Sequence, residues 1–452
     1  MKINRENLLK TVSYASRLTA KKSSLPVLSH VLLDGEKQEL QATDLEIGMS
    51  YPLFIEDYTR VVEAEKFPDE DRIENQLGDL SGPQLKNLAD DYGIKVAAKA
   101  KVEKLRETIL QACREAEAKL SVEAILGFDP EPKTWHEKFC LPCAGLKRIL
   151  ESLEEETVEI TTAGDGNTLF KAAPHVRIGE NFHDLYTCDV EEFPVMADEV
   201  AEYEFPVQVH VVRGNLDNVA VACTREEAGF NLSGIDFDLS DAGNPCIVAT
   251  DGHRLHWVKL DDVVLPEENL PEDFAFLMPS EAMKVIRAAF GKDEAVPIEY
   301  NREHKMIRVR FGKGGRFYIR PLEAKFPDWK VVIPKAEDQK TVTLEKSALE
   351  KPLNQALTIA DGRYAGMRVR FNGGVDLEFS NPDKGSYQKI SIPIKSKNYS
   401  DEEVTLSLNM KYIVEAMRPV TTDDLEIRFQ DAGKALCMAH ENFNAIVMPM
   451  RV

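Results

Sequence analysis

The stretch VQVHVVRGNLDNVAVACT, residues 207–224, is typical of a short strand that runs directly into a helix with apolar residues at helical spacing. The same plan opens at residues 3–18 and again at residues 342–361. A second strand-to-helix unit and alternating strands follow in each copy. These second units span residues 139–153, 276–290 and 406–417. Because each helix can bury its apolar stripe only against a sheet, the repeat predicts three similar α+β domains, with helices on one face of antiparallel sheets.

The spacing of the copies indicates an insertion in the first one. The starts of the first and second copies lie 204 residues apart, and those of the second and third lie 135 apart. The surplus falls at about residues 55–138. We therefore predict a first domain at 1–203 interrupted by this insertion, a second at 204–338 and a third at 339–452.

The insertion has a helical pattern of its own over about residues 77–118. Leu85, Leu88, Ala89 and Tyr92 have helical spacing, Gly93 stops that helix, and a basic helix follows. The basic residues of the second helix are Lys95, Lys99, Lys101, Lys104 and Arg106. This pattern resembles the small two-helix SAP and Rho-N-terminal modules that bind nucleic acid. Such a module would add a DNA contact or dock a protein, and a plain helical hairpin is the alternative.

The composition is that of a folded, acidic protein. Of the 452 residues 43% are apolar, and the net charge is −21. That charge argues against a protein that coats nucleic acid or anionic membrane with its whole surface, but it allows a local basic surface. The polar N-terminus and the lack of a long apolar run predict a soluble, cytoplasmic protein with no membrane partner. The seven cysteines are expected to be reduced thiols.

Several short phrases carry a resemblance to a known family. They are LPVL (25–28), ATDLE (42–46), VATDGHRL (248–255), KFPDW (325–329) and VMPMRV (447–452). Together they resemble the bacterial DNA polymerase III beta subunit, the sliding clamp, over nearly all of the chain outside residues 55–138. The resemblance implies a head-to-tail homodimeric ring of six similar domains that encircles duplex DNA. It also implies that polymerase and clamp loader bind the ring through short linear motifs.

The resemblance places DNA contacts on basic loops and helices. The loop positions are Lys21 and Lys22 in the first domain and Arg225 in the second. The helix positions are Lys147, Arg148, Lys284 and Arg287. Attraction to phosphate needs only such a local lining and carries no sequence specificity. Ordinary solvated helix charges are the alternative interpretation of each.

Ring closure is expected to pair an edge of the first domain with an edge of the third. The resemblance places it near Leu357, Thr358 and Ile359, with Leu146 and Ile149 as candidates opposite. Pairing with a second protomer would satisfy the backbone N–H and C=O groups of an otherwise exposed edge strand. The alternative is that these residues end a helix that faces its own core.

The C-terminal residues predict a binding surface. Chain ends are usually polar and frayed, so the apolar end AIVMPMRV (445–452) must be docked, and a Met-rich surface suits varied peptides. The resemblance places a peptide pocket between the second and third domains, with Leu232, Leu255, Val332 and Ile446 as apolar walls. The position of Val331 is basic in some clamps. The full set is Leu232, Thr250, Gly252, His253, Arg254, Leu255, Pro327, Val331, Val332, Ile446, Met448, Pro449, Met450 and Arg451.

Signs of catalysis are weak. Asp251, His253 and His256 lack the further ligands of a metal site, and Cys140 and Cys143 have redox spacing without a second pair. We expect no catalytic residues, no metal and no cofactor. The competing hypothesis is a metal-dependent nucleic-acid or nucleotide hydrolase on a repeated α+β scaffold.

Overall fold

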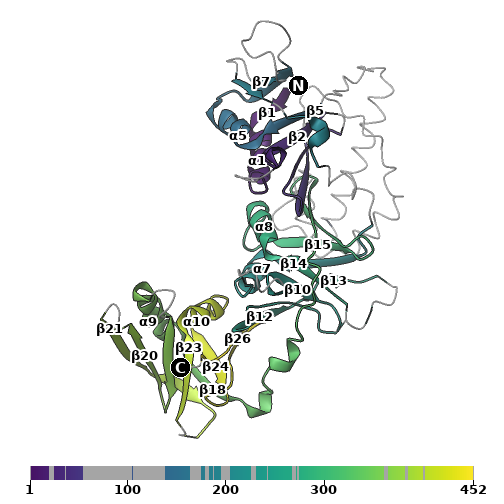
Figure 1. Cartoon of the computed structure of the whole chain (residues 1–452). Helices are drawn as coiled ribbons and strands as arrows, with labels where there is room; N and C mark the ends of the chain where they lie inside the picture. Colours follow the sequence, from purple (N-terminus) through teal and green to yellow (C-terminus); the bar gives the residue numbers. More distant parts are fainter. Residues whose placement is uncertain are drawn as a thin grey trace. The chain divides into compact units, whose positions relative to one another are not determined.

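The computed structural model describes most of the chain outside the insertion. The described residues are 2–53 without 20–24 and 36, Lys104, and 138–450 without 163–174, 179–182, 187, 195–203, 225–230, 242, 267–270, 272–273, 361–364, 382–384 and 401–402. The chain forms two compact units (Figure 1). The N-terminal unit comprises residues 1–195 with 312–316, and the C-terminal unit comprises 196–311 with 317–452.

The described part of the N-terminal unit holds a pair of packed helices and two runs of antiparallel strands. The helices are α1 (Arg5–Ala15) and α5 (Cys143–Ser152). One run has the order β1-β6-β7-β8, with bounds Lys2–Asn4, Thr157–Thr162, His175–Ile178 and His183–Tyr186. The other has the order β4-β3-β2-β5, with bounds Ile47–Pro52, Glu39–Thr43, His30–Asp34 and Lys138–Pro142.

The C-terminal unit repeats this plan twice. The first copy pairs α7 (Arg213–Ala220) with α8 (Met283–Ala289), and the second pairs α9 (Lys346–Ile359) with α10 (Met410–Met417). The strands of the first copy are β9 (Val207–Val212), β10 (Gly234–Asp238), β11 (Cys246–Thr250), β12 (Arg254–Lys259), β13 (Val263–Val264), β14 (Ala275–Pro279), β15 (Ala295–Asn301), β16 (Met306–Phe311) and β17 (Gly315–Ile319). Those of the second are β18 (Lys340–Glu345), β19 (Gly366–Phe371), β20 (Val375–Asn381), β21 (Ser386–Ile392), β22 (Ile394–Lys397), β23 (Val404–Asn409), β24 (Asp424–Phe429), β25 (Leu436–His440) and β26 (Phe443–Val447).

The strand orders make the repetition plain. The run β1-β6-β7-β8 corresponds to β9-β15-β16-β17 and to β18-β24-β25-β26, and β5-β2-β3-β4 corresponds to β14-β10-β11-β12 and to β23-β19-β20-β21. In every copy a strand passes directly into a helix, because buried apolar residues switch from every second to every third or fourth position. The α+β class predicted from the sequence is confirmed. The predicted domain boundaries stay a prediction.

Local chemistry fixes where the helices begin. The Asn4 side chain accepts a hydrogen bond from the Asn7 backbone N–H at 3.1 Å at the start of α1, and Asn409 does the same for Lys411 at 3.0 Å at the start of α10. Each cap lets the preceding strand turn at once into a helix. No helix among the described residues is long and apolar enough to cross a membrane.

An edge-to-edge strand pair joins the two copies within the C-terminal unit. β12 of the first copy runs antiparallel to β26 of the second, with Leu255 opposite Ile446 and Arg254 opposite Val447. The polar and apolar groups of the candidate site meet at this seam.

Candidate partner-binding site

The site is built on a tight turn between β11 and β12. The Asp251 carboxylate accepts hydrogen bonds from the backbone N–H groups of His253 and Arg254 at 3.0 and 3.1 Å. The buried Thr250 hydroxyl accepts from Gly252 N–H at 3.0 Å and donates to the Arg254 carbonyl at 2.5 Å. Gly252 has φ +84°, a conformation that favours glycine. The turn therefore presents His253 to solvent, and Thr250, predicted to orient a peptide, instead holds the turn together.

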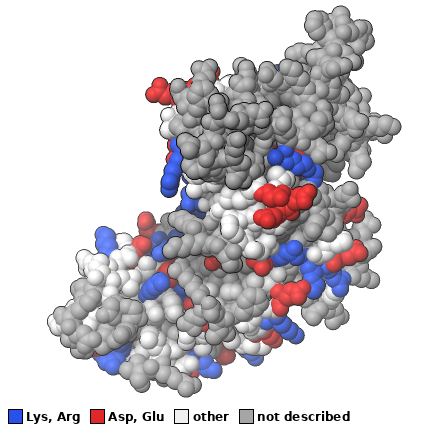
Figure 2. Space-filling view, turned by 45° about the horizontal axis from the view of Figure 1, so that its top comes forward, with Lys and Arg blue, Asp and Glu red and all other residues white. Residues whose placement is uncertain are grey.

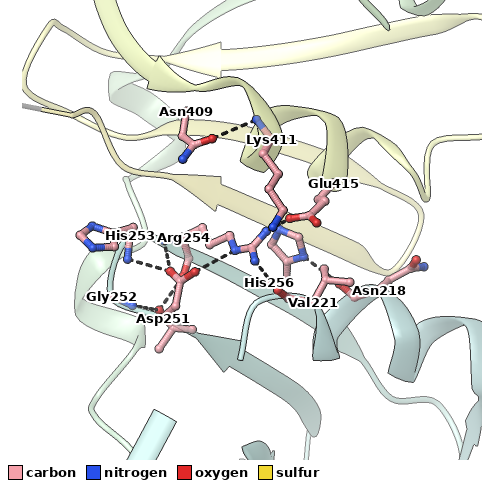
Figure 3. A network of polar contacts seen from close by, with 11 residues as sticks. Asn218, Val221, Asp251, Gly252, His253, Arg254, His256, Asn409, Lys411 and Glu415 are labelled. Carbon is pink, nitrogen blue, oxygen red and sulfur yellow. Dashed lines mark hydrogen bonds and ion pairs between the residues drawn. The ribbon is translucent and has the colours of Figure 1, made fainter. Parts of the chain in front are cut away.

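Arg254 fastens this turn to the helices of both copies (Figure 3). Its side chain is 6% exposed and pairs with Asp251 at 3.0 Å, with Glu415 of α10, and with the Val221 carbonyl that follows α7. The guanidinium also lies 4.3 Å from the centre of the Tyr412 ring. A buried arginine is stable only when its charge is compensated in this way. Arg254 was predicted among the residues of the peptide pocket, but its Nε, Nη1 and Nη2 atoms are all hydrogen-bonded within the chain, so its side chain supports the pocket from beneath.

His256 is buried behind the same seam. Its Nδ1 lies 2.7 Å from the Asn218 carbonyl and therefore carries the proton, while Nε2 has no partner among the described residues. The ring packs edge-on against Phe443. Burial lowers the pKa of His256 to about 4, so the ring is neutral at physiological pH.

The apolar part of the site differs from the predicted pocket wall. Leu255 is 4% exposed and Ile446 1% exposed, because both pack in a core cluster with Trp329 and Val248. They support the surface from beneath. Leu232 and Pro449 are half-buried, and Pro327 is exposed.

Four other apolar side chains face solvent here. The exposed fractions are 73% for Val331, 45% for Val332, 37% for Met448 and 43% for Met450. The two valines lie in η5 (Lys330–Val332), directly after the buried Trp329. Exposed apolar side chains gathered at one seam are typical of a surface that binds a partner.

The C-terminal segment is docked onto this seam. Met448 N–H donates to the His253 carbonyl at 2.8 Å, and Met450 N–H donates to the Ser407 carbonyl at 2.7 Å. The first bond places Met448 beside the turn that carries His253, and the second places Met450 beside β23. Arg451 lies outside the described residues.

Most of the predicted DNA-contacting helix charges are paired within the chain. Lys147 lies 4.0 Å from Glu151, Lys284 pairs with Glu281, and Arg287 pairs with Asp217 at 2.6 Å. Arg148 is exposed and forms no ion pair with any residue that the structure describes. On the face shown in Figure 2, basic and acidic side chains are interspersed. Lys21, Lys22 and Arg225 lie outside the described residues.

The insertion and the predicted dimer contacts are only partly described. Lys104 is an exposed helical residue, and the described residues do not include Lys95, Lys99, Lys101 or Arg106. Leu357 is half-buried and Thr358 exposed near the end of α9, and the side chain of Ile359 is outside the description. The candidate Leu146 is wrong, because its side chain is fully buried between α5 and its sheet.

Two family models match the chain at its two ends. The N-terminal domain of the DNA polymerase III beta subunit matches residues 1–72, and the C-terminal domain of the same subunit matches residues 330–451. Both matched segments fall in one family, the DNA polymerase III beta subunit. The beta sliding clamp of Pseudomonas aeruginosa is 21% identical over 100% of this chain and 99% of its own, and that of Proteus mirabilis is 23% identical over 66% and 77%.

Solved structures of this beta subunit family share the fold. A sliding clamp of Pseudomonas aeruginosa has a TM-score of 0.68 at 19% identity, covering 100% of this chain and 99% of that one. A sliding clamp of Bacillus subtilis has a TM-score of 0.70 at 14% identity, covering 100% and 98%. A further Pseudomonas aeruginosa structure is of a clamp bound to griselimycin.

The cysteines and the aspartate and histidines that suggested redox or metal chemistry form no such site among the described residues. Cys140 and Cys143 are buried free thiols, and burial raises the pKa of Cys140 to about 12. Among the described residues no three His, Cys, Asp or Glu side chains gather as a metal site would require. The sequence reasoning missed Glu415, whose one signal is a carboxylate within the apolar helix MKYIVEAM.

Proposed function

We propose that this protein is the processivity factor of a replicative DNA polymerase, a homodimeric sliding clamp without catalytic activity that acts in the cytoplasm. The observation that carries the proposal is the match of both ends of the chain to one subunit family, with collinear similarity to a clamp over the full length. The clamp holds polymerase on duplex DNA by topology. A weak, sequence-independent attraction to phosphate then suffices, and the ring remains free to slide.

The strand edges support closure by a second copy. The seam between β12 and β26 shows how a sheet of one repeat continues into a sheet of the next. Among the described strands, β8 and β21 each lie at one end of a four-stranded sheet, at the positions that correspond to β26 and β12 in the other repeats. By the repetition of the strand orders, β21 of one protomer would pair with β8 of another, close to the α9 end that carries Leu357 and Thr358.

We further propose that Val331, Val332, Met448 and Met450 receive the apolar anchors of short motifs in polymerase and clamp loader. His253 and the backbone of its turn would orient the motif. The insertion at about 77–118 would add a separate DNA or protein contact outside this surface.

Changing one exposed anchor-binding residue tests this surface. We expect Met448→Asp to raise the Kd of a polymerase-derived peptide at least tenfold. Burial of an apolar side chain such as Met448 contributes about 1.5–3 kcal/mol to binding, and the substitution replaces it with a charge. The matched control is Val264→Asp, which alters another apolar side chain, 51% exposed, on β13. Fluorescence anisotropy with labelled peptide measures both. Equal Kd values for the two variants would contradict the assignment.

Arg148 offers the cleanest test of the DNA lining. Because Arg148 is exposed on α5 and pairs with no acidic residue that the structure describes, we expect Arg148→Gln to lower the salt slope of DNA binding by about one phosphate contact. Arg302→Gln, in the exposed turn after β15, keeps the same change of charge and is expected to leave the slope unchanged. If both variants lower the salt slope equally, the net charge of the protein and not the position of Arg148 sets its attraction to DNA.

A further inference from the structure

A second cleft lies in the C-terminal unit, next to the partner-binding surface. Its volume is about 680 Å³, and it is lined by parts of β10 and β14, by Tyr300, and by residues 321–330. Pro327 and the segment that leads into η5 form one side of the cleft. The cleft therefore adjoins Val331 and Val332 along the chain and shares only Pro327 with the predicted peptide pocket.

Two aspartates of β10 line the cleft. Asp236 and Asp238 are two residues apart on a strand and so point to the same face of the sheet. The Asp238 carboxylate is neutralised within the chain, since it accepts from the Trp329 indole N–H at 3.0 Å and lies 2.9 Å from the Lys330 ammonium. Burial acts to raise the pKa of Asp238, but hydrogen bonds from Ser240, Lys330 and Trp329 outweigh it and hold the pKa below its ordinary value.

Asp236 has no such compensation. Its side chain is 6% exposed, yet it forms no hydrogen bond or ion pair within the part of the chain that the structure describes. Burial, followed by the neighbouring charge of Asp238, raises the pKa of Asp236 to about 7. The charge of Lys330 lowers the pKa of Asp236 without cancelling this rise, because the Lys330 ammonium pairs with Asp238, and Lys305 pairs with Glu323 at 2.7 Å. A buried carboxyl without a partner is costly unless a ligand supplies one.

We propose that this cleft receives an arginine side chain of a replication partner, with its guanidinium on Asp236. The apolar lining from Phe276, Leu277 and Leu322 suits the aliphatic stem, and a planar guanidinium can donate two hydrogen bonds to one carboxylate. The identity of the partner rests on the proposed function, whereas the chemistry of the cleft does not. A partner anchored on Val331 and Val332 would reach the cleft past Pro327.

A divalent metal ion fits the cleft less well. Asp236 and Asp238 provide two carboxylates, one of them already paired with Lys330, and no third His, Cys, Asp or Glu of the described residues gathers with them. Metal sites in proteins usually combine more oxygen ligands than this.

A small cationic peptide tests the proposal on the full-length protein. The probe is acetyl-Gly-Arg-Gly-amide, and its partner probe carries citrulline, which has the shape of arginine without the charge. We expect saturable binding of the arginine peptide by ligand-observed NMR, with a Kd on the order of 1 mM, and binding at least about tenfold weaker for citrulline. Asp236→Asn is expected to raise the Kd of the arginine peptide about tenfold. Asp241→Asn, at an exposed aspartate beyond β10, is expected to leave that Kd unchanged.

Several outcomes would overturn the proposal. Equal binding of the two peptides, equal binding by the wild type and Asp236→Asn, or no saturable binding would each do so. Competition of the peptide by MgCl₂ at constant ionic strength would assign the cleft to a metal ion instead. Because the probe has no apolar anchor, a negative result leaves the proposed peptide surface and the ring untouched.

Discussion

Replacing Arg254 with methionine is expected to lower the free energy of unfolding by about 3–5 kcal/mol. The substitution leaves the Glu415 carboxylate buried without its partner and removes the bond to the Val221 carbonyl. It also frees the turn that presents His253, so the affinity for partner peptide should fall together with stability. Urea unfolding of the full chain at a fixed protein concentration measures the first effect, and peptide anisotropy measures the second.

The control for Arg254 is an arginine in an exposed ion pair. Arg428 lies 2.6 Å from Glu426, and both side chains are about 40% exposed. Arg428→Met should therefore cost no more than about 1 kcal/mol. The double variant Arg254→Met/Glu415→Leu should recover much of the loss, because no unpaired charge is left on α10. If Arg254→Met and Arg428→Met have equal effects, Arg254 does not hold the two repeats together.

Acidification is expected to destabilise the protein through His256 by up to about 3 kcal/mol. The pKa of His256 is about 4 in the folded protein, against an ordinary value of 6.5. Above pH 6.5 the ring is neutral in the folded and the unfolded protein, so it does not change the free energy of unfolding with pH. Between pH 6.5 and 4 the unfolded chain binds a proton that the folded protein excludes, so stability falls as the pH falls, and the full loss is reached below pH 4.

The His256 contribution is isolated by difference. His256→Leu should remove this loss, so its unfolding free energy should rise relative to that of His253→Gln, at the exposed histidine of the turn, by up to about 3 kcal/mol as the pH falls from 6.5 to 4. Urea unfolding at several pH values gives both curves. The buried Asp236 titrates with the opposite sign over this whole range, because its pKa is raised from 3.8 to about 7, but it is present in both variants and cancels in the difference between them. Identical curves for the two variants would show that His256 is not responsible.

The repeated strand-to-helix units are predictable from the sequence because they depend on residues that are close together in the chain. The switch from strand to helix at 207–224 and the Asn caps of α1 and α10 depend on residues within a few positions of one another. The strand pairing of β12 with β26 was not predictable from such patterns, since its partners lie almost 200 residues apart.

The errors at the site have the same physical origin. The family resemblance assigns Arg254 to the peptide pocket, but its charge is neutralised by Glu415, 161 residues away. The resemblance also predicts Leu255 and Ile446 as pocket walls, but both are buried with Trp329 in one core cluster. Sequence pattern identifies apolar and charged residues, whereas only the tertiary contacts decide which of them remain free to bind a partner.

Retention on circular and linear DNA tests the topological function most directly. The protein, which should run in sizing chromatography at twice the chain mass of 50.8 kDa, is loaded by its cognate loader onto a nicked circle and onto the same DNA after linearisation. A closed ring should stay on the circle and slide off the free ends of the linear form. Equal retention on both forms would contradict the clamp function, because binding would then depend on contacts and not on encirclement.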